Sequence, residues 1–172
     1  MTRPRLFARR LSLLAVAAAA AVSLAGCSLL GSTFGGDSTP RGDDGQVIEQ
    51  NDSADVFTIR VGDCLNDASA SDEVTQVPLV PCSEPHDSEV YASIILTGDS
   101  FPGNDAVIAE ADDACFERFE EFVGIPYLDS IYDFSYYFPT EGSWANGDRE
   151  ILCVIYDPAG QKLTGSLAGI AR

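Results

Sequence analysis

The residue of this sequence best suited to acid–base or metal chemistry is its only histidine, His86. It lies in the segment PCSEPHDSE, residues 81–89, with Asp87 beside it. A histidine can act as a general base oriented by a carboxylate, or as a metal ligand. Asp87 is poorly placed to orient it, because adjacent residues of an extended chain point to opposite sides. A metal site would need several converging ligands.

A second catalytic group does not accompany His86. The sequence has no Gly-x-Ser-x-Gly motif, which would place a nucleophilic serine on a sharp turn. We expect a polar turn in which His86 makes a local hydrogen bond, and we keep His86 as a candidate binding residue. The sequence therefore predicts a protein that is not an enzyme, with no catalytic residue, no cofactor and no metal site.

Aromatic side chains are dense between residues 127 and 150. Amphipathic rings at this density can form a platform for a sugar, a peptide or a partner protein. The alternative is that the rings fill the core of a small domain, which we expect for about half of them. Tyr136, Tyr137 and Trp144 are the candidate binding residues. Asp148 and Arg149 are further candidates, although a turn with an ion pair is the simpler interpretation.

Five cysteines, Cys27, Cys64, Cys82, Cys115 and Cys153, indicate an oxidising compartment. Four of them lie in the region predicted to fold and allow three pairings. We predict Cys64–Cys82, which closes two neighbouring strand ends, and Cys115–Cys153, which ties a helix to an apolar strand. A zinc site is the competing use, but the Cys-x-x-Cys pairs that it favours are absent.

The fifth cysteine, Cys27, has a different predicted role. Residues 1–26 have a basic start and then an uncharged apolar run, which is typical of a signal peptide. The segment LAGC, residues 24–27, resembles the lipobox of bacterial lipoproteins, in which the cysteine is acylated and becomes the mature N-terminus. Cys27 is therefore predicted to anchor the protein in the cell membrane, on its extracytoplasmic face. An ordinary signal peptide cut at a small residue is the alternative.

Charge and composition divide the remaining chain. Removal of residues 1–26 takes away four Arg and no acid, so 6 Lys+Arg face 27 Asp+Glu and the net charge is −21. This balance argues against nucleic acid, whose binding depends on cationic groups. Residues 27–55 are rich in Gly, Ser and Asp and are predicted to be the lipidated cysteine and a flexible tether. Residues 56–172 are predicted to form one extracytoplasmic domain.

Within that domain the hydrophobic pattern predicts strands at residues 56–64, 74–82, 89–96, 151–156 and 161–169. Pro78 and Pro81 should confine the second of these to an edge of the sheet or cut it short. Apolar residues from 108 to 122 recur at helical spacing, and residues 151–156 are apolar on both faces, as in a central strand. We expect the α+β class, a single small domain in which an antiparallel sheet carries one long helix and two disulfides.

The segments VGDCLND, PCSEPHDSEVYA, ACFERFEEFVG and YYFPTEGSWANGDREILCVIY, in this order, resemble the septum formation domain family of actinobacterial membrane proteins and lipoproteins. The resemblance implies an extracytoplasmic domain connected with the division septum and without established catalytic chemistry. We expect a lipid-anchored interaction module that contacts an envelope or division protein. The alternative is a cell-wall ligand-binding protein or hydrolase that uses the His86 region and the aromatic loop.

Overall fold

The computed structural model describes residues 39–70 and 73–172 of the chain. The chain divides into two units, Met1–Gly36 and Asp37–Arg172, and all described residues belong to the second unit. The predicted signal peptide and Cys27 therefore lie outside the described residues. Within residues 39–70 and 73–172, no helix is both long enough and apolar enough to cross a membrane.

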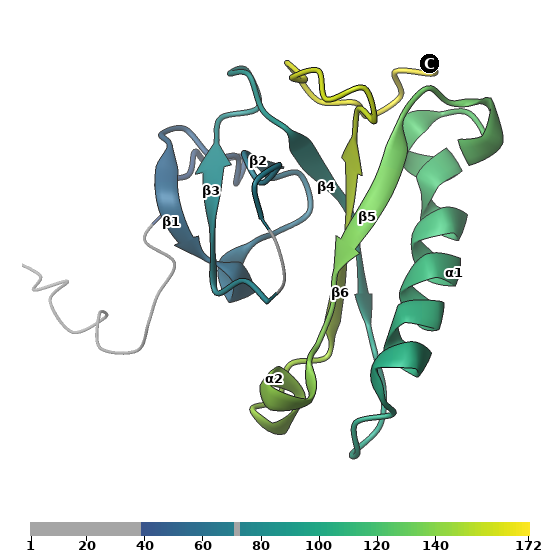
Figure 1. Cartoon of the computed structure of the whole chain (residues 1–172). Helices are drawn as coiled ribbons and strands as arrows, with labels where there is room; N and C mark the ends of the chain where they lie inside the picture. The colour runs from purple at the N-terminus through teal and green to yellow at the C-terminus, as the bar shows by residue number, and fades with distance from the viewer. Residues whose placement is uncertain (1–38, 71–72) are drawn as a thin grey trace, which may run out of the picture. The chain divides into compact units, whose positions relative to one another are not determined.

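One antiparallel sheet of six strands forms the framework of the described unit (Figure 1). The strands lie in the order β1-β3-β2-β4-β6-β5, and every neighbouring pair is antiparallel. Along the chain the elements are β1 (Asn51–Asp55), the 3-10 helix η1 (Val56–Thr58), β2 (Cys64–Leu65), β3 (Gln76–Val80), β4 (Ser88–Ile95), α1 (Asn104–Val123), the 3-10 helix η2 (Tyr127–Asp129), β5 (Asp133–Tyr137), α2 (Glu141–Ala145) and β6 (Glu150–Tyr156). The predicted α+β domain, a sheet with one long helix, is confirmed.

Helix α1 packs beside β4, β6 and β5 (Figure 1). Its buried residues recur at a spacing of four, which keeps them on one face of a helix; they are Val107, Ala111, Cys115, Phe119 and Val123. The ring of Phe119 lies edge-on to Tyr91, with centroids 6.0 Å apart. The helix ends at Gly124, whose φ of 91° is a left-handed conformation that glycine adopts readily.

Strand β6 is apolar on both faces because both faces are covered. Ile151, Cys153 and Ile155 belong to the core cluster that packs against α1. Leu152 and Val154 belong to a second cluster, which they share with residues of β1, β2 and β3. The prediction of a central strand at residues 151–156 is confirmed, with β4 on one side and β5 on the other.

Strand β4 confirms the prediction at residues 89–96 with one correction. Its pairing with β6 shifts between Val90 and Ala92, as at a β-bulge. Val90 consequently packs in the second cluster, whereas Ala92 and Ile94 pack on the side of α1. The single apolar face predicted from the alternation is therefore divided between the two faces of the sheet.

The two disulfides join the cysteines that the sequence paired. Cys64 of β2 is bonded to Cys82, just after β3, with α carbons 5.2 Å apart. Cys115 of α1 is bonded to Cys153 of β6, with α carbons 5.6 Å apart. The second bond fastens the helix directly to the central strand.

The folded unit begins earlier than the predicted boundary at residue 56. Thr39, Val47 and Ala54 are buried, and β1 pairs with β3. The Arg41 guanidinium forms a two-pronged ion pair with the Asp63 carboxylate, with Nη2 2.9 Å from Oδ2. The predicted tether at residues 27–55 is thus wrong for residues 39–55, because contacts with distant residues order this segment and its own hydrophobicity does not.

Two of the predicted strands are largely absent. Residues 56–58 form η1, started by the Asp55 carboxylate, which accepts a hydrogen bond from the Phe57 backbone at 3.0 Å, and only Cys64 of residues 56–64 lies in a strand. In residues 161–169 a single bridge pairs Leu163 with His86. Turns at Gly165 and Gly169, whose φ values are 79° and 67°, prevent a longer pairing.

Strand β3 is an inner strand and not an edge strand, but it is cut short as the alternative expected, since it ends at Val80, before Pro81. Pro78 lies opposite Asn66, one residue beyond the end of the short strand β2, and its carbonyl accepts the Asn66 N–H at 3.0 Å. Its missing N–H leaves the reciprocal bond to the Asn66 carbonyl unmade at the point where β2 ends, so the proline limits the length of the β2–β3 pairing without interrupting it.

Candidate functional site

A groove of about 2080 Å³ lies along β5 and β6, on the sheet face that carries Leu152 and Val154 and not on the face packed against α1. Its walls come from η1 and the segment after β2, and from α2 and the turn that precedes β6. Small-ligand pockets typically measure about 300–1,000 Å³. This groove therefore has room for a segment of a polymer.

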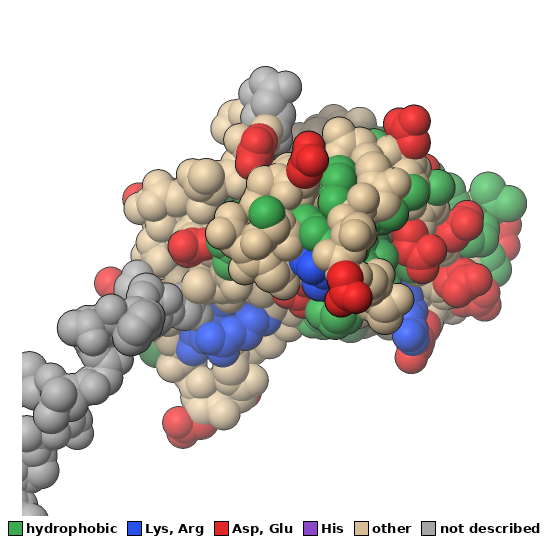
Figure 2. Space-filling model, turned by 90° about the horizontal axis from the view of Figure 1, so that it is seen from below, with side chains coloured by type: hydrophobic (Ala, Val, Ile, Leu, Met, Phe, Trp, Pro, Cys, Tyr) green, Lys and Arg blue, Asp and Glu red, His purple; other side chains and the backbone are tan. Residues whose placement is uncertain are grey.

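The groove has an apolar floor and an apolar rim. Leu152 and Val154 of β6 form the floor with Tyr137 of β5, and Phe57 and Ile95 at the rim are 64% and 63% exposed. Seen from below, hydrophobic side chains gather over the right half of the surface, with acidic side chains and a few Lys or Arg side chains among them (Figure 2). Exposed apolar side chains that line a groove are typical of a binding surface.

A half-buried hydrogen-bond network at the groove wall centres on Asp67. Its carboxylate accepts from the Ser88 hydroxyl at 2.7 Å and from the Tyr137 hydroxyl at 2.7 Å. Burial, followed by the charge of Asp67, raises the pKa of Tyr137 far above its ordinary value. The phenol therefore stays protonated and donates to Asp67, which fixes the Tyr137 ring against the floor.

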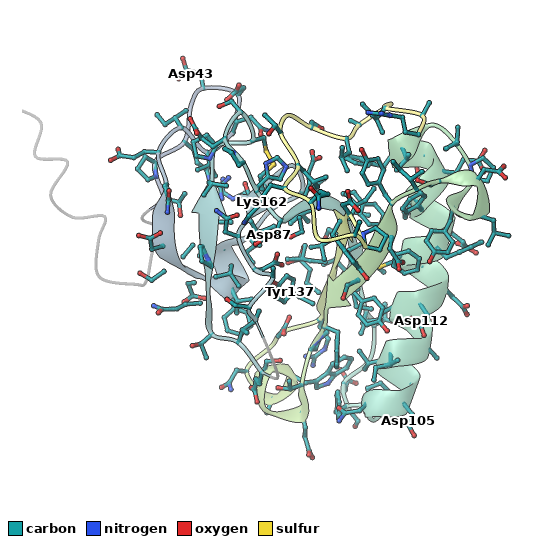
Figure 3. The ribbon with its side chains drawn as sticks, turned by 45° about the horizontal axis from the view of Figure 1, so that its top comes forward. Asp43, Asp87, Asp105, Asp112, Tyr137 and Lys162 are labelled. Atoms are coloured by element: carbon teal, nitrogen blue, oxygen red, sulfur yellow. A yellow bond between two sulfur atoms is a disulfide. The ribbon has the colours of Figure 1, made fainter. Side chains whose placement is uncertain are left out.

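A second polar group at the wall already binds a cation. The Lys162 ammonium lies 2.6 Å from Oδ1 of Asp87 and 2.7 Å from Oδ1 of Asn66. The other Asp87 oxygen accepts the Ala68 N–H at 3.1 Å. Asp87, Lys162 and Tyr137 lie near one another in Figure 3. This part of the wall has the oxygen ligands and the charge that hold an ammonium group.

The opposite wall contains Arg149, whereas Trp144 lies behind it and does not line the groove, and here the structure corrects the sequence-based interpretation. Trp144 is only 3% exposed and cannot serve as a surface platform. The Arg149 guanidinium lies 3.7 Å from the centroid of the Trp144 ring and donates to the Trp144 carbonyl at 2.8 Å. Asp148 instead accepts from the Ser143 hydroxyl at 2.8 Å. The predicted Asp148–Arg149 ion pair is replaced, within the described part of the chain, by a cation–π contact.

Tyr136 and Tyr137 lie on different sides of β5, because successive residues of a strand alternate. The Tyr136 hydroxyl donates to Asp112 of α1 at 2.8 Å. Burial raises the pKa of Tyr136 to about 12, and the hydrogen bond to Asp112 contributes. Both candidate tyrosines are among the residues that line the groove; Tyr137 is fixed by its hydrogen bond to Asp67, and Tyr136 fastens β5 to the helix.

His86 lies away from the groove and is fully buried. Its Nδ1 is 2.8 Å from the Glu84 carbonyl oxygen, which confirms the predicted local hydrogen bond and requires that Nδ1 carry the proton. Nε2 is buried without a partner among the described residues. The expected polar turn precedes His86, where the Glu84 N–H donates to the Pro81 carbonyl at 2.8 Å, but the ring belongs to the interior and a substrate in the groove would not meet it.

Three possible metal-ligating residues, Cys64, Cys82 and Glu89, approach one another within 4.8 Å. The two sulfurs are bonded to each other, so neither is a thiolate ligand. The Glu89 oxygens accept hydrogen bonds from the Ser166 hydroxyl at 2.6 Å and the Leu167 N–H at 2.7 Å. Glu89 therefore fastens the C-terminal segment. The three residues together do not resemble a metal centre.

Several groove residues were missed by the sequence analysis, namely Phe57, Asp67, Glu73, Asp87, Ile95 and Glu141. They come from five separate segments, so no local motif unites them. One signal was available: the alternation in YDFSYYF, residues 132–138, predicts a strand that sends Tyr136 and Tyr137 to different faces. Treating residues 127–150 as a loop concealed strand β5.

Comparison with known proteins finds a matching family for this chain. No curated protein and no solved structure matches it. The family described as "Septum formation" matches residues 25–153, which is most of the chain and includes β1 to β5, α1 and both disulfides. The chain therefore belongs to the septum formation family.

Proposed function

We propose that this protein is a lipid-anchored, extracytoplasmic interaction module that docks on an envelope or division protein through its groove. The observation that carries the proposal is the groove itself, which is too large for a typical small ligand and has exposed apolar side chains, Phe57 and Ile95, at its rim. Membership of the septum formation family supports a role in septum formation or cell division.

Binding is favoured over catalysis by the groups that the groove presents. The phenol of Tyr137 is held protonated, and Asp67 and Asp87 are already hydrogen-bonded. The only histidine is buried elsewhere. The alternative, a hydrolase based on His86, would need a base that reaches the substrate. The ring of His86 is buried, which does not favour this alternative.

The lipid anchor belongs to the same proposal. Two disulfides fit an extracytoplasmic protein. Acylated Cys27 would supply the two acyl chains that stable anchoring requires. Because the folded unit includes Thr39, the chain between Cys27 and Thr39 can extend at most about 40 Å, which keeps the groove near the membrane. Cys27→Ser should release the protein into the medium, and a variant that stays bound after carbonate washing would refute the anchor.

The docking function is tested by crosslinking in living cells followed by mass spectrometry. The expected result is reproducible capture of a division or wall-synthesis protein by the native chain and loss of that capture in the Phe57→Ala/Ile95→Ala variant. Leu128→Ala is the matched control, since Leu128 is 83% exposed and does not line the groove. Equal capture by both variants would show that the groove is not the docking surface.

A further inference from the structure

The groove is strongly acidic. Its described lining includes seven carboxylates and one cation, Arg149, which is already stacked on Trp144. The carboxylates are those of Asp67, Glu73, Asp87, Glu141, Asp148, Glu150 and Asp157. Charge complementarity at an interface sets the choice of partner and the rate of encounter. A lining of this kind repels anionic polymers and attracts cationic ones.

The carboxylates are not equally available. Asp67, Asp87 and Asp148 are held by the hydrogen bonds described above, and Glu150 accepts from the Ser93 hydroxyl. Glu73 and Glu141 are exposed, and neither has an ion-pair partner within the described part of the chain. A partner can therefore pair with these two carboxylates without breaking an existing contact.

Lys162 shows which chemistry fits the wall. Its ammonium lies between Asp87 and Asn66 at 2.6 and 2.7 Å, although its side chain is 49% exposed. An exposed side chain with many rotamers is held in this position because two oxygens converge on it. The wall thus holds a lysine from this chain, and other carboxylates along the groove are open to cationic side chains from another.

Apolar contacts accompany the charges. Phe57 and Ile95 remain exposed at the rim, while Leu152 and Val154 lie at the floor. A purely cationic small molecule would leave the exposed side chains of Phe57 and Ile95 uncovered and would fill little of a groove of about 2080 Å³. An extended polypeptide that alternates cationic and apolar side chains can satisfy both features, because its alternate side chains point in opposite directions.

We propose that the groove binds an extended segment of a partner protein in which lysine or arginine side chains pair with Glu73 and Glu141 while apolar side chains cover Phe57 and Ile95. This inference rests on the proposed docking function and adds the chemistry of the partner. It also predicts that binding weakens as salt concentration rises, since the rim carboxylates are exposed.

The test uses the full chain with Cys27→Ser, so that no membrane is required, and measures binding by fluorescence anisotropy. The probe is a labelled synthetic peptide of alternating lysine and leucine, and the comparison peptide has glutamate in place of lysine. We expect binding of the lysine peptide alone. Amide chemical shifts of Ala68, Ser135 and Tyr137, which line the groove, should change on binding.

A charge-matched pair of variants separates the groove from the general acidity of the protein. Glu73→Lys/Glu141→Lys should weaken binding by about tenfold or more, whereas Glu110→Lys/Glu117→Lys on the exposed side of α1 should change it by less than about twofold. Equal weakening by both pairs would mean that net charge and not the groove binds the peptide. Binding of the glutamate peptide, or no binding of the lysine peptide, would overturn the proposal.

The cellular experiment distinguishes this inference from the function on which it rests. Partner capture that is lost in Phe57→Ala/Ile95→Ala but kept in Glu73→Lys/Glu141→Lys would leave the docking function standing and refute the cationic partner. Capture that survives in both variants would refute the docking function and the inference together. Loss of capture in both, with retention in Glu110→Lys/Glu117→Lys, supports both.

Discussion

Removing the disulfide between Cys115 and Cys153 should destabilise the domain more than removing the disulfide between Cys64 and Cys82. The first bond joins cysteines 38 residues apart, and the second joins cysteines 18 residues apart. On the loop-entropy model these bonds contribute about 4 and about 3 kcal/mol. Burial adds to the difference, because both sulfurs of the longer loop lie among fully buried residues such as Phe119, while Cys82 is only partly buried.

The assay is urea unfolding of Cys115→Ala/Cys153→Ala and Cys64→Ala/Cys82→Ala, each in the Cys27→Ser background. The fluorescence of the only tryptophan, Trp144, reports the transition. With an m value of about 2 kcal/mol/M, a loss of about 4 kcal/mol lowers the urea midpoint by about 2 M. If Cys64→Ala/Cys82→Ala has the lower midpoint, the account of α1 as an element fastened through its disulfide is wrong.

Three further predictions concern buried polar and aromatic groups. Burial raises the pKa of Glu89 above its ordinary value near 4.5, so the free energy of unfolding should fall as pH rises from the ordinary pKa through the raised one. Urea unfolding across this range should show a weaker fall for Glu89→Gln, and an identical fall would contradict this origin. In a pH titration of the native chain, followed by the absorbance of tyrosinate, one tyrosine should deprotonate near pH 12, and Tyr136→Phe should lack this step. Asp112→Asn should lower the pKa of Tyr136. Arg149→Ala should cost about 1 kcal/mol of stability and shift the emission of Trp144, whereas Arg149→Lys should retain part of the contact; unchanged emission would argue against stacking.

The features that the sequence predicted correctly have strong local or pairwise signals. The helix was visible because Ala111, Cys115 and Phe119 repeat at its period. The central strand was visible because residues 151–156 are apolar throughout. The disulfide pairing followed once both elements were assigned, since Cys115 lies on the apolar stripe of the helix and Cys153 in the middle of the strand.

The features that were missed depend on contacts between distant residues. Strand β1 has the sequence NDSAD and buries one apolar side chain, Ala54, so it has no hydrophobic period to detect. Its neighbouring segment is held by the ion pair of Arg41 with Asp63, across 22 positions of the chain. In residues 56–64 the alternation was real, but the Asp55 carboxylate starts a 3-10 turn at Phe57 and leaves that ring exposed.

The described part of the chain has more apolar strand faces than long helices to cover them. A strand that is apolar on both faces needs cover on both faces, and β6 is such a strand, whereas the described chain contains only one long helix. Leu152 and Val154 obtain their second cover from residues of β1, β2 and β3. This cover leaves Leu152 and Val154 only 5% and 4% exposed, and the apolar surface that stays open lies at the rim of the groove, where Phe57 and Ile95 are 64% and 63% exposed. The exposed apolar surface of the groove therefore comes from rim side chains in separate segments, and the density of aromatic residues between 127 and 150 did not reveal it.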